Sequence, residues 1–386
     1  MTARKTLGGR NAQMEGMQEK LWFASDYMEG AHPALMARLA ETNMEHCAGY
    51  GLDVYSESAR EKIRTACKAP EADIFFLAGG TQANACVIDT VLRPYQGVMA
   101  AETGHVSVHE AGAIEYGGHK VLALPHEEGK VTAASIAACV EAWCSDANRE
   151  HMVMPGVAYI SQPTEYGTLY SLAELEEISR VCHESDVALF LDGARLAYAL
   201  ACDASDVALA DIARLCDAFY IGGTKCGALL GEAVVFPKHD YVPHFFSIIK
   251  QHGALLAKGR VCGVQFDELF TDGLYGRIGR VAIEAADRIR ALLVECGYEL
   301  VIDSPTNQVF VALDDAQLAA LSEHVEMGFI EKLSDGRTVM RFCTSWATSL
   351  EDVDALADVL SSVSNPSCRI AETSIGPFPS SVVLQG

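Results

Sequence analysis

Basic residues are scarce in this chain of 386 residues. Lysine and arginine together number 29, against 52 aspartates and glutamates, which gives a formal net charge of −23. A surface of this sign repels polyanions, so nucleic acid and anionic membranes are not expected partners. Long apolar runs are also missing, and residues 1–20 are polar, so neither a membrane helix nor a signal peptide is expected. We therefore expect a cytoplasmic protein whose partner is a small molecule.

Several motifs of metal and nucleotide binding are absent. The 13 cysteines include no CxxC pair and the 12 histidines no HExxH pair, so no metal site is predicted. The cysteines are odd in number and scattered, which disfavours a disulfide framework. Cys86, Cys182 and Cys216 fall in apolar helical patterns and are expected to be buried. Neither GxGxxG nor GxxxxGK[ST] occurs, which counts against dinucleotides and nucleoside triphosphates.

Short apolar runs alternate with helical patterns through the first two thirds of the chain. Such alternation predicts an α/β fold with a mostly parallel sheet and helices on both faces. The helical patterns include Leu172–His183, and a helix is also expected after Pro33 and near Ser56. The predicted strands are Ile74–Ala78, Val98–Ala101, Val121–Leu124, Val157–Ser161, Ala188–Leu191, Ala218–Ile221 and Ala233–Phe236.

The pattern changes beyond Gly276, where we expect a smaller α+β domain. We assign residues 1–20 to a flexible segment, 21–270 to a large domain with an N-terminal arm, 271–363 to the small domain and 364–386 to a loosely held tail. The elements predicted in the small domain are helices Ile278–Cys296, Gln317–His324 and Leu350–Val363, and strands Leu300–Asp303, Val309–Leu313 and Thr338–Phe342.

The segment YIGGTKCGALLG, residues 220–231, places Lys225 after a buried strand and among glycines. Burial favours the uncharged amine, and the uncharged amine attacks carbonyl groups. Lys225 is therefore a candidate Schiff-base lysine, and the glycines would let a flat ring lie against the backbone. The alternative is an exposed lysine in a glycine-rich turn.

Two other strand ends carry chemistry. Gly79, Gly80 and Thr81 lie between a strand and a helix, where backbone N–H groups and a hydroxyl can bind phosphate, although a tight turn needs the same residues. Asp192 ends the most apolar strand, so a cation must meet it. That cation is either Arg195 or a protonated pyridine nitrogen. Because sites in such sheets lie at carboxyl strand ends, the phosphate turn, Asp192 and the lysine together match the requirements of pyridoxal phosphate.

Two further residues have a functional and an ordinary interpretation. His105 follows another strand end, where an imidazole could stack on a cofactor ring or move a proton; the alternative is a solvated loop histidine. Arg341 ends a strand of the small domain and either binds a substrate carboxylate or forms a surface ion pair.

The sequence resembles the threonine aldolase/β-eliminating lyase family of fold-type-I pyridoxal phosphate enzymes, and within it the bacterial low-specificity L-threonine aldolases. The resemblance covers about residues 22 to 363 and implies the aspartate aminotransferase-like fold of that group. The motifs that carry it are FASDYMEGAHP, GGTQAN, ETGHVSVHEAGAIE, SQPTEYGTLY, LDGARL, GGTKCGALLGEAVVF, LLAKGR, LFTDGLY and RFCTSW.

The resemblance implies a role for each matching residue. Lys225 would bind the cofactor as an aldimine, Asp192 would pair with the pyridine nitrogen, and His105 would stack on the ring and serve in catalysis. Gly80, Thr81 and Thr224 would hold the phosphate, with Arg260 supplied by a neighbouring subunit, so a homodimer or homotetramer is expected. Ser25, Arg195 and Arg341 would bind the substrate carboxylate, and Arg195 also borders the cofactor.

One departure from the family pattern concerns proton transfer. Many relatives carry a histidine in the loop that matches Ser161–Gly167, whereas this chain reads SQPTEYG, so the general base is open between His105 and a bound water. His109 is unusual for its position and is expected near the substrate. The implied function is cleavage of L-threonine or L-allo-threonine to glycine and an aldehyde. The alternatives are β-elimination, as in a tyrosine phenol-lyase-like enzyme, and a catalytically silent binding protein.

Overall fold

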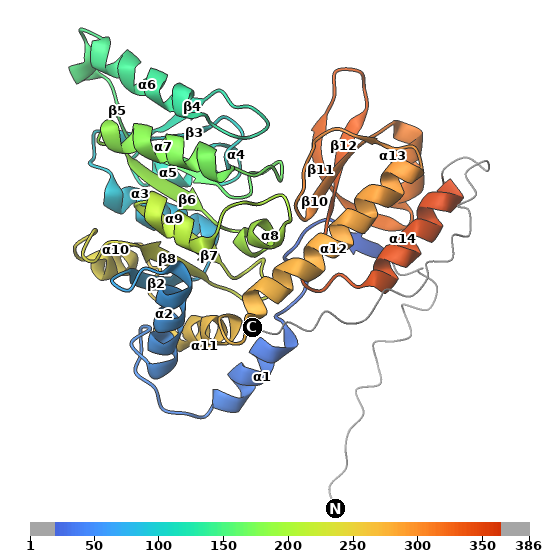
Figure 1. Ribbon diagram of the computed structural model, residues 1–386, viewed down its shortest axis with the longest axis horizontal. Coiled ribbons are helices and arrows are strands. Elements are labelled where there is room, and N and C mark those ends of the chain that lie inside the picture. Colours follow the sequence, from blue (N-terminus) through green and yellow to red (C-terminus); the bar gives the residue numbers. More distant parts are fainter. Residues whose placement is uncertain (1–19, 364–386) are drawn as a thin grey trace, which may run out of the picture.

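The computed structural model describes residues 20–363, which form two β-sheets with one long helix, α12, running between them (Figure 1). The predictions for residues 1–19 and for the tail 364–386 lie outside the described residues. No helix within 20–363 is both long and apolar enough to cross a membrane.

The larger sheet has the strand order β2-β8-β7-β6-β5-β3-β4. Its neighbouring strands are parallel except for β8, which is antiparallel to β2 and β7. The predicted mostly parallel sheet is confirmed. The exception arises because only residues 223–231 link β7 to β8, too few for a crossover helix. The strands are β2 (Asp73–Leu77), β3 (Gln96–Ala101), β4 (Val121–Leu124), β5 (Met154–Ser161), β6 (Ala188–Asp192), β7 (Ala218–Gly222) and β8 (Glu232–Phe236).

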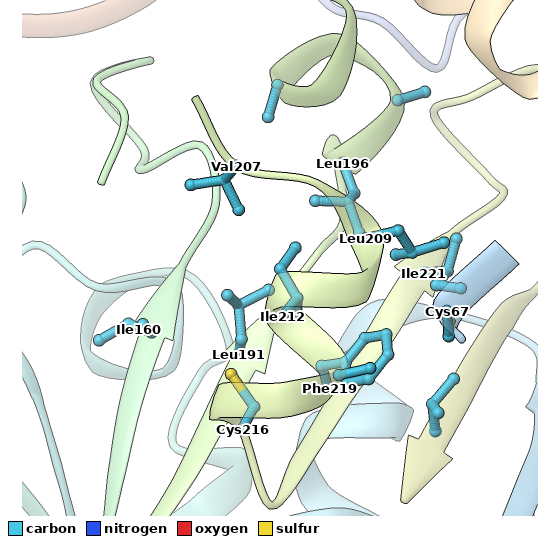
Figure 2. Close-up of a cluster of buried hydrophobic side chains, with 14 of the residues drawn as sticks. Cys67, Ile160, Leu191, Leu196, Val207, Leu209, Ile212, Cys216, Phe219 and Ile221 are labelled. Carbon is cyan, nitrogen blue, oxygen red and sulfur yellow. The ribbon is translucent and has the colours of Figure 1, made fainter. Parts of the chain in front are cut away.

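Helices cover both faces of this sheet because its strands are apolar on both sides. In β6, Leu189 and Leu191 join one buried cluster and Phe190 joins the other, as the period of two along a strand requires. Figure 2 shows part of the first cluster, where Leu191 and Phe219 pack near Ile212 of α9. The helices that contribute to the first cluster are α1 (Pro33–Thr42), α2 (Val54–Cys67), α6 (Ala133–Ser145), α7 (Leu172–Glu184), α8 (Leu196–Ala201), α9 (Leu209–Leu215), α11 (Arg260–Leu269) and α12 (Leu274–Glu295). Those on the other face are α3 (Gly80–Val91), α4 (His105–Val108), α5 (Ala113–Tyr116) and α10 (Phe245–Gln251).

The smaller sheet has the order β1-β11-β12-β10-β9 and packs against α12, α13 and α14 through a third buried cluster. Its first strand, β1, comes from the N-terminal arm and pairs in parallel with β11. The domain division proposed from the sequence groups the arm with residues 21–270, whereas Leu21–Phe23 of the arm form a strand of the smaller sheet. The elements are β1 (Leu21–Phe23), β9 (Glu299–Leu300), β10 (Gln308–Leu313), β11 (Val325–Lys332), β12 (Thr338–Cys343), α13 (Asp315–Ser322) and α14 (Leu350–Val363).

Three element predictions need correction. Strand β11, VEMGFIEK, was not predicted because its outer half is exposed and charged. Strand β9 is only two residues long, shorter than the predicted Leu300–Asp303. Helix α2 begins at Val54 rather than near Ser56, because the Asp53 carboxylate caps its first N–H groups.

Helix α12 begins at Leu274, four residues before the predicted start, and crosses α8 closely. The crossing depends on Gly279, where an added Cβ would lie 2.2 Å from the Ala197 carbonyl oxygen. Gly276 in the same helix has no atom within 4 Å of such a Cβ. Substitution at Gly279 therefore tests the close packing of α12 on α8, whereas the same substitution at Gly276 tests only helix propensity.

We expect Gly279→Ala to destabilise the protein by about 1–3 kcal/mol, because the methyl group forces α8 and α12 apart. The matched variant Gly276→Ala should be neutral or stabilising by roughly 0.5–1 kcal/mol, since alanine is the better helix former. Urea unfolding followed by circular dichroism measures both. Equal effects of the two substitutions would contradict close packing at Gly279.

Candidate active site

Most of the predicted site residues meet in one cavity of about 320 Å³ at the carboxyl ends of the parallel strands. This is the position at which ligands bind in open α/β sheets. The predicted residues that line the cavity are Gly80, Thr81, His105, Asp192, Arg195, Thr224 and Lys225.

Lys225 lies three residues past β7 and is half-buried. Its backbone carbonyl accepts a hydrogen bond of 2.5 Å from the Tyr198 hydroxyl, which fixes the chain beneath the side chain. Within residues 20–363, no hydrogen bond or ion pair engages the Lys225 amine. A half-buried amine without a protein partner is available for chemistry inside the cavity.

The glycines before Lys225 do not serve the purpose predicted for them. A Cβ on Gly222 would lie 2.2 Å from the Ala194 carbonyl oxygen, and one on Gly223 would lie 2.6 Å from the Gly231 carbonyl oxygen. At both positions, backbone atoms of neighbouring segments occupy the space that a side chain would need. The expectation that these two glycines make room for a flat ring is therefore wrong, because they allow neighbouring chain segments to approach.

Asp192 is 5% exposed and is held by four donors. The Tyr159 hydroxyl and the Asn84 amide donate to Oδ2 at 2.6 and 3.1 Å. The Tyr220 hydroxyl and the Ala194 N–H donate to Oδ1 at 2.5 and 3.0 Å. Burial alone raises the pKa of Asp192, but the nearby His105 and these hydrogen bonds outweigh it and leave the pKa below its ordinary value. The carboxylate is thus kept ionised.

Arg195 does not pair with Asp192, so that alternative is wrong. Its Nε and Nη2 instead donate to the two carboxylate oxygens of Asp26 at 2.6 and 3.0 Å, and the Asn307 amide donates to the same Asp26 at 3.0 Å. Burial raises the pKa of Asp26, but Arg195 and Lys225 outweigh it and hold the pKa far below its usual range.

His105 begins the short helix α4 (His105–Val108), and its ring is held by a buried carboxylate. Nδ1 lies 2.6 Å from Oε1 of Glu110, and the Asn84 amide donates to that same oxygen at 2.7 Å. Burial lowers the pKa of His105, but the Glu110 hydrogen bond and the charge of Asp192 outweigh it and raise the pKa. The protonated imidazole is therefore more stable at this site than it is in water.

The predicted phosphate turn leaves free backbone donors at the start of α3. Gly79 caps this helix without a side-chain hydrogen bond, so its first N–H groups face the cavity edge. Gly80 has no room for a side chain, since a Cβ would lie 2.9 Å from the Tyr220 hydroxyl. Thr224 contributes a hydroxyl from the opposite wall, where its Oγ1 accepts a hydrogen bond from the Gly231 N–H at 3.1 Å.

Glu232 also lines this cavity and was not predicted. It pairs with Leu77 across β8 and β2, next to the glycine turn, and accepts a hydrogen bond of 3.1 Å from the Gly223 N–H. Burial raises the pKa of Glu232 to about 8. A carboxyl group that is neutral at pH 7 lets an anion approach the turn.

A second cavity of about 510 Å³ contains Arg341 and leads toward the small sheet. Nη1 of Arg341 donates to Gln308 Oε1 at 2.8 Å and Nη2 to the Ala24 carbonyl at 3.0 Å. Nε of Arg341 and Oγ of Ser25 are buried without a hydrogen-bond partner among the described residues. Arg341 lines this second cavity, whereas Ser25 lines neither of the two cavities.

Two remaining predicted residues differ in position. His109 lines both cavities, as expected of a residue near the substrate. Arg260, at the start of α11, lines neither of these two cavities in this chain. Its guanidinium donates to the carbonyls of Thr42 and Glu45 at 2.8 and 3.1 Å.

Several site residues were missed because sequence offers only weak signals for them. Asn84, Tyr220 and Asp26 lie inside or next to quoted motifs, but a buried donor to another residue is not recognisable from spacing. Side chains alternate between the two faces along β5, and this alternation turns Tyr159 toward Asp192. In residues 20–363, no cluster of three or more His, Cys, Asp or Glu side chains is arranged to hold a metal ion.

Comparison with known proteins gives concordant matches. The chain is 32% identical over 344 residues to the low specificity L-threonine aldolase of Pseudomonas aeruginosa, covering 87% of this chain and 95% of that protein. A Pseudomonas species protein of the same name matches over the same shares at 32% identity.

Solved structures agree with the fold. A threonine aldolase of Leishmania major is 42% identical with a TM-score of 0.86, covering 89% of this chain and 99% of that chain. An aspartate aminotransferase variant of Thermus thermophilus is 16% identical and has a TM-score of 0.65. The match covers 91% of this chain and 93% of that chain, and at this identity it shows similarity of fold alone. The predicted fold class is thereby confirmed.

The model of the beta-eliminating lyase family matches residues 23–347, which include every predicted site residue. Since this match spans most of the chain, the protein belongs to the beta-eliminating lyase family.

Proposed function

We propose that this protein is a pyridoxal phosphate-dependent aldolase that cleaves L-threonine, L-allo-threonine and related β-hydroxy-α-amino acids to glycine and an aldehyde. The observation that carries the proposal is the unpaired amine of Lys225 in one cavity with ionised Asp192, beside a second cavity that holds Arg341. The names of the relatives at 32% and 42% identity support the same reaction.

The residues of the first cavity fit pyridoxal phosphate. Lys225 would hold its aldehyde carbon, and His105, which lines the same cavity, would hold its ring. The uncapped start of α3, Thr81 and Thr224 suit the phosphate, and neutral Glu232 does not oppose it. Asp192 supplies the negative charge that a protonated ring nitrogen needs.

When bound, the cofactor supplies an electron sink for the bond broken at the substrate α-carbon. This chain's contribution is orientation. Arg341 and the Ser25 hydroxyl bind the substrate carboxylate, and Arg195, held rigid by Asp26, fixes that end of the cavity. Fixing the carboxylate aligns one bond of the α-carbon for cleavage, and orientation of this kind selects aldol cleavage over other reactions.

We also propose that the active enzyme is a homodimer or homotetramer. Arg260 matches the arginine that the family supplies from a neighbouring subunit, and in this chain its guanidinium does not line either cavity. In an oligomer, Arg260 of a second copy would bring its positive charge to the phosphate. The first subunit would contribute the N–H groups at the start of α3 and the threonine hydroxyls.

Purified protein with pyridoxal phosphate is expected to convert L-threonine and L-allo-threonine to equal amounts of glycine and acetaldehyde. Lys225→Ala should lack the visible absorbance of the lysine-bound cofactor and lose activity by on the order of 100-fold to 10,000-fold. Product chromatography and an absorbance spectrum measure both. Formation of a 2-oxo acid and ammonia without aldehyde would establish β-elimination instead, and identical spectra of both proteins would indicate a silent binding protein.

Arg341→Gln is expected to raise the KM for L-threonine by roughly 10-fold to 150-fold, since a hydrogen bond to a charged group contributes about 1.5–3 kcal/mol. Steady-state kinetics with acetaldehyde detection measures the change. Arg337→Gln is the control, because that half-buried arginine pairs with Glu299 just before β12 and lines neither cavity. An unaltered KM in Arg341→Gln would place the carboxylate site elsewhere.

A further inference from the structure

Glu165 lies in the loop that follows β5 and is held by one of its two oxygens. The Ser161 hydroxyl and the His105 backbone N–H each donate to Oε1 at 3.0 Å. Oε2 accepts no hydrogen bond from any other described residue, and the Glu165 side chain lines the cavity. One oxygen thus fixes the side chain and the other is free for a ligand.

The loop that carries Glu165 is firmly attached. The Gln162 side chain exchanges two hydrogen bonds with the Tyr170 backbone, at 2.9 and 3.1 Å. At Gly167, the hydroxyls of Ser304 and Thr306 donate to the backbone carbonyl at 3.3 and 2.9 Å. The position of the carboxylate is therefore set by the fold, as a group that exchanges protons with a substrate requires.

Glu165 also stands where the two cavities meet. Among the described carboxylates, it is the one that lines both the cavity with Asp192 and the cavity with Arg341. A substrate joined to the cofactor at its nitrogen and held at its carboxylate by Arg341 must place its α- and β-carbons at this junction. The β-hydroxyl group is then within the region that Glu165 faces.

The histidines nearby are less suited to accept a proton. Nδ1 of His105 is engaged by Glu110, and the Glu110 hydrogen bond and the charge of Asp192 outweigh burial and raise the pKa of that ring, so less of the neutral imidazole is present to accept a proton. His109 lines both cavities and its pKa is lowered, chiefly by burial and by the charge of His105. No hydrogen bond of a described residue positions the His109 ring, whereas two bonds position Glu165.

Burial and the charge of Asp192 raise the pKa of Glu165 above that of ordinary glutamate. A raised pKa makes a carboxylate a better proton acceptor at neutral pH. The titratable and charged groups around it are His105 on α4, Tyr159 on β5, Asp192 on β6, Arg195 just before α8, and Tyr166 and Tyr170 of its own loop.

We propose that Glu165 is the catalytic base that accepts the proton of the substrate β-hydroxyl group at Oε2. This role rests on the aldol cleavage proposed above. As the O–H bond breaks, its electron pair becomes the second bond of the aldehyde C=O. The Cα–Cβ bond breaks, and its electron pair stays with the α-carbon. A proton then joins the α-carbon to give glycine, and Glu165 releases its proton, so no net proton is consumed.

The test compares Glu165→Gln with the wild-type holoenzyme in two reactions. Cleavage of L-threonine should fall by on the order of 100-fold to 10,000-fold in kcat, the range for loss of a general base. Exchange of the glycine α-hydrogen with deuterium from solvent, followed by NMR, involves no hydroxyl proton and should stay near the wild-type rate. Glutamine preserves the hydrogen bonds that Oε1 accepts. Glu102→Gln, an exposed carboxylate just past β3, removes the same charge outside the cavities and should affect neither reaction.

The pH profile gives a second readout. Wild-type kcat/KM should fall as the pH drops through the pKa of Glu165, at a pH above the ordinary glutamate range. That acid limb should be missing in Glu165→Gln. In Glu165→Ala, added formate should restore part of the cleavage by taking the place of the carboxylate.

Two outcomes would overturn the role of Glu165. One is cleavage by Glu165→Gln at the wild-type rate, and the other is a parallel loss of glycine exchange, which would mean a structural or cofactor-binding role. A large loss of cleavage confined to His109→Phe would transfer the role to His109. If wild-type holoenzyme cleaves neither threonine isomer, the proposed function itself fails, and the role of Glu165 fails with it.

Discussion

The buried ion pair between Asp26 and Arg195 joins three parts of the chain that are far apart in the sequence. Asp26 comes from the N-terminal arm, Arg195 follows β6 of the large sheet, and Asn307, which donates to the same carboxylate, precedes β10 of the small sheet. Removing one partner of a buried pair leaves an uncompensated charge, at a cost of about 3–5 kcal/mol. The contact therefore sets how the two sheets face each other, and with that the shape of both cavities between Asp192 and Arg341.

A second constraint is that the site contains several buried carboxyl groups with different protonation. Asp192 is surrounded by hydrogen-bond donors and by His105, so its pKa is lowered and it stays ionised. Glu165 and Glu232 lack enough such donors, and burial raises the pKa of each. Asp192 thereby provides a fixed negative charge, Glu165 a carboxylate able to exchange a proton, and Glu232 a neutral group beside which an anion can bind. These three environments are set by which backbone N–H and hydroxyl groups reach each carboxyl group.

Much of the architecture could be predicted from the chain alone. Runs such as Ala188–Leu191 are apolar at every position, which is typical of a strand covered on both faces, and the structure has β6 there. Strand β11 could not be predicted because the half of it that extends past β1 has mostly solvent-exposed and charged side chains, so no apolar pattern marks it. The register between strands was also beyond reach, and it is the register that places Glu232 beside the phosphate turn.

The sequence by itself determined the order of strands and helices, the motifs around Lys225 and Asp192, and the family to which the chain belongs, because these follow from local composition and spacing. Only the tertiary structure decided which groups meet. It paired Arg195 with Asp26 rather than Asp192, gave Asp192 its four donors, and brought Glu165 to the junction of the two cavities. The physical reason is that burial and hydrogen bonding between distant segments depend on packing, which no short stretch of sequence encodes.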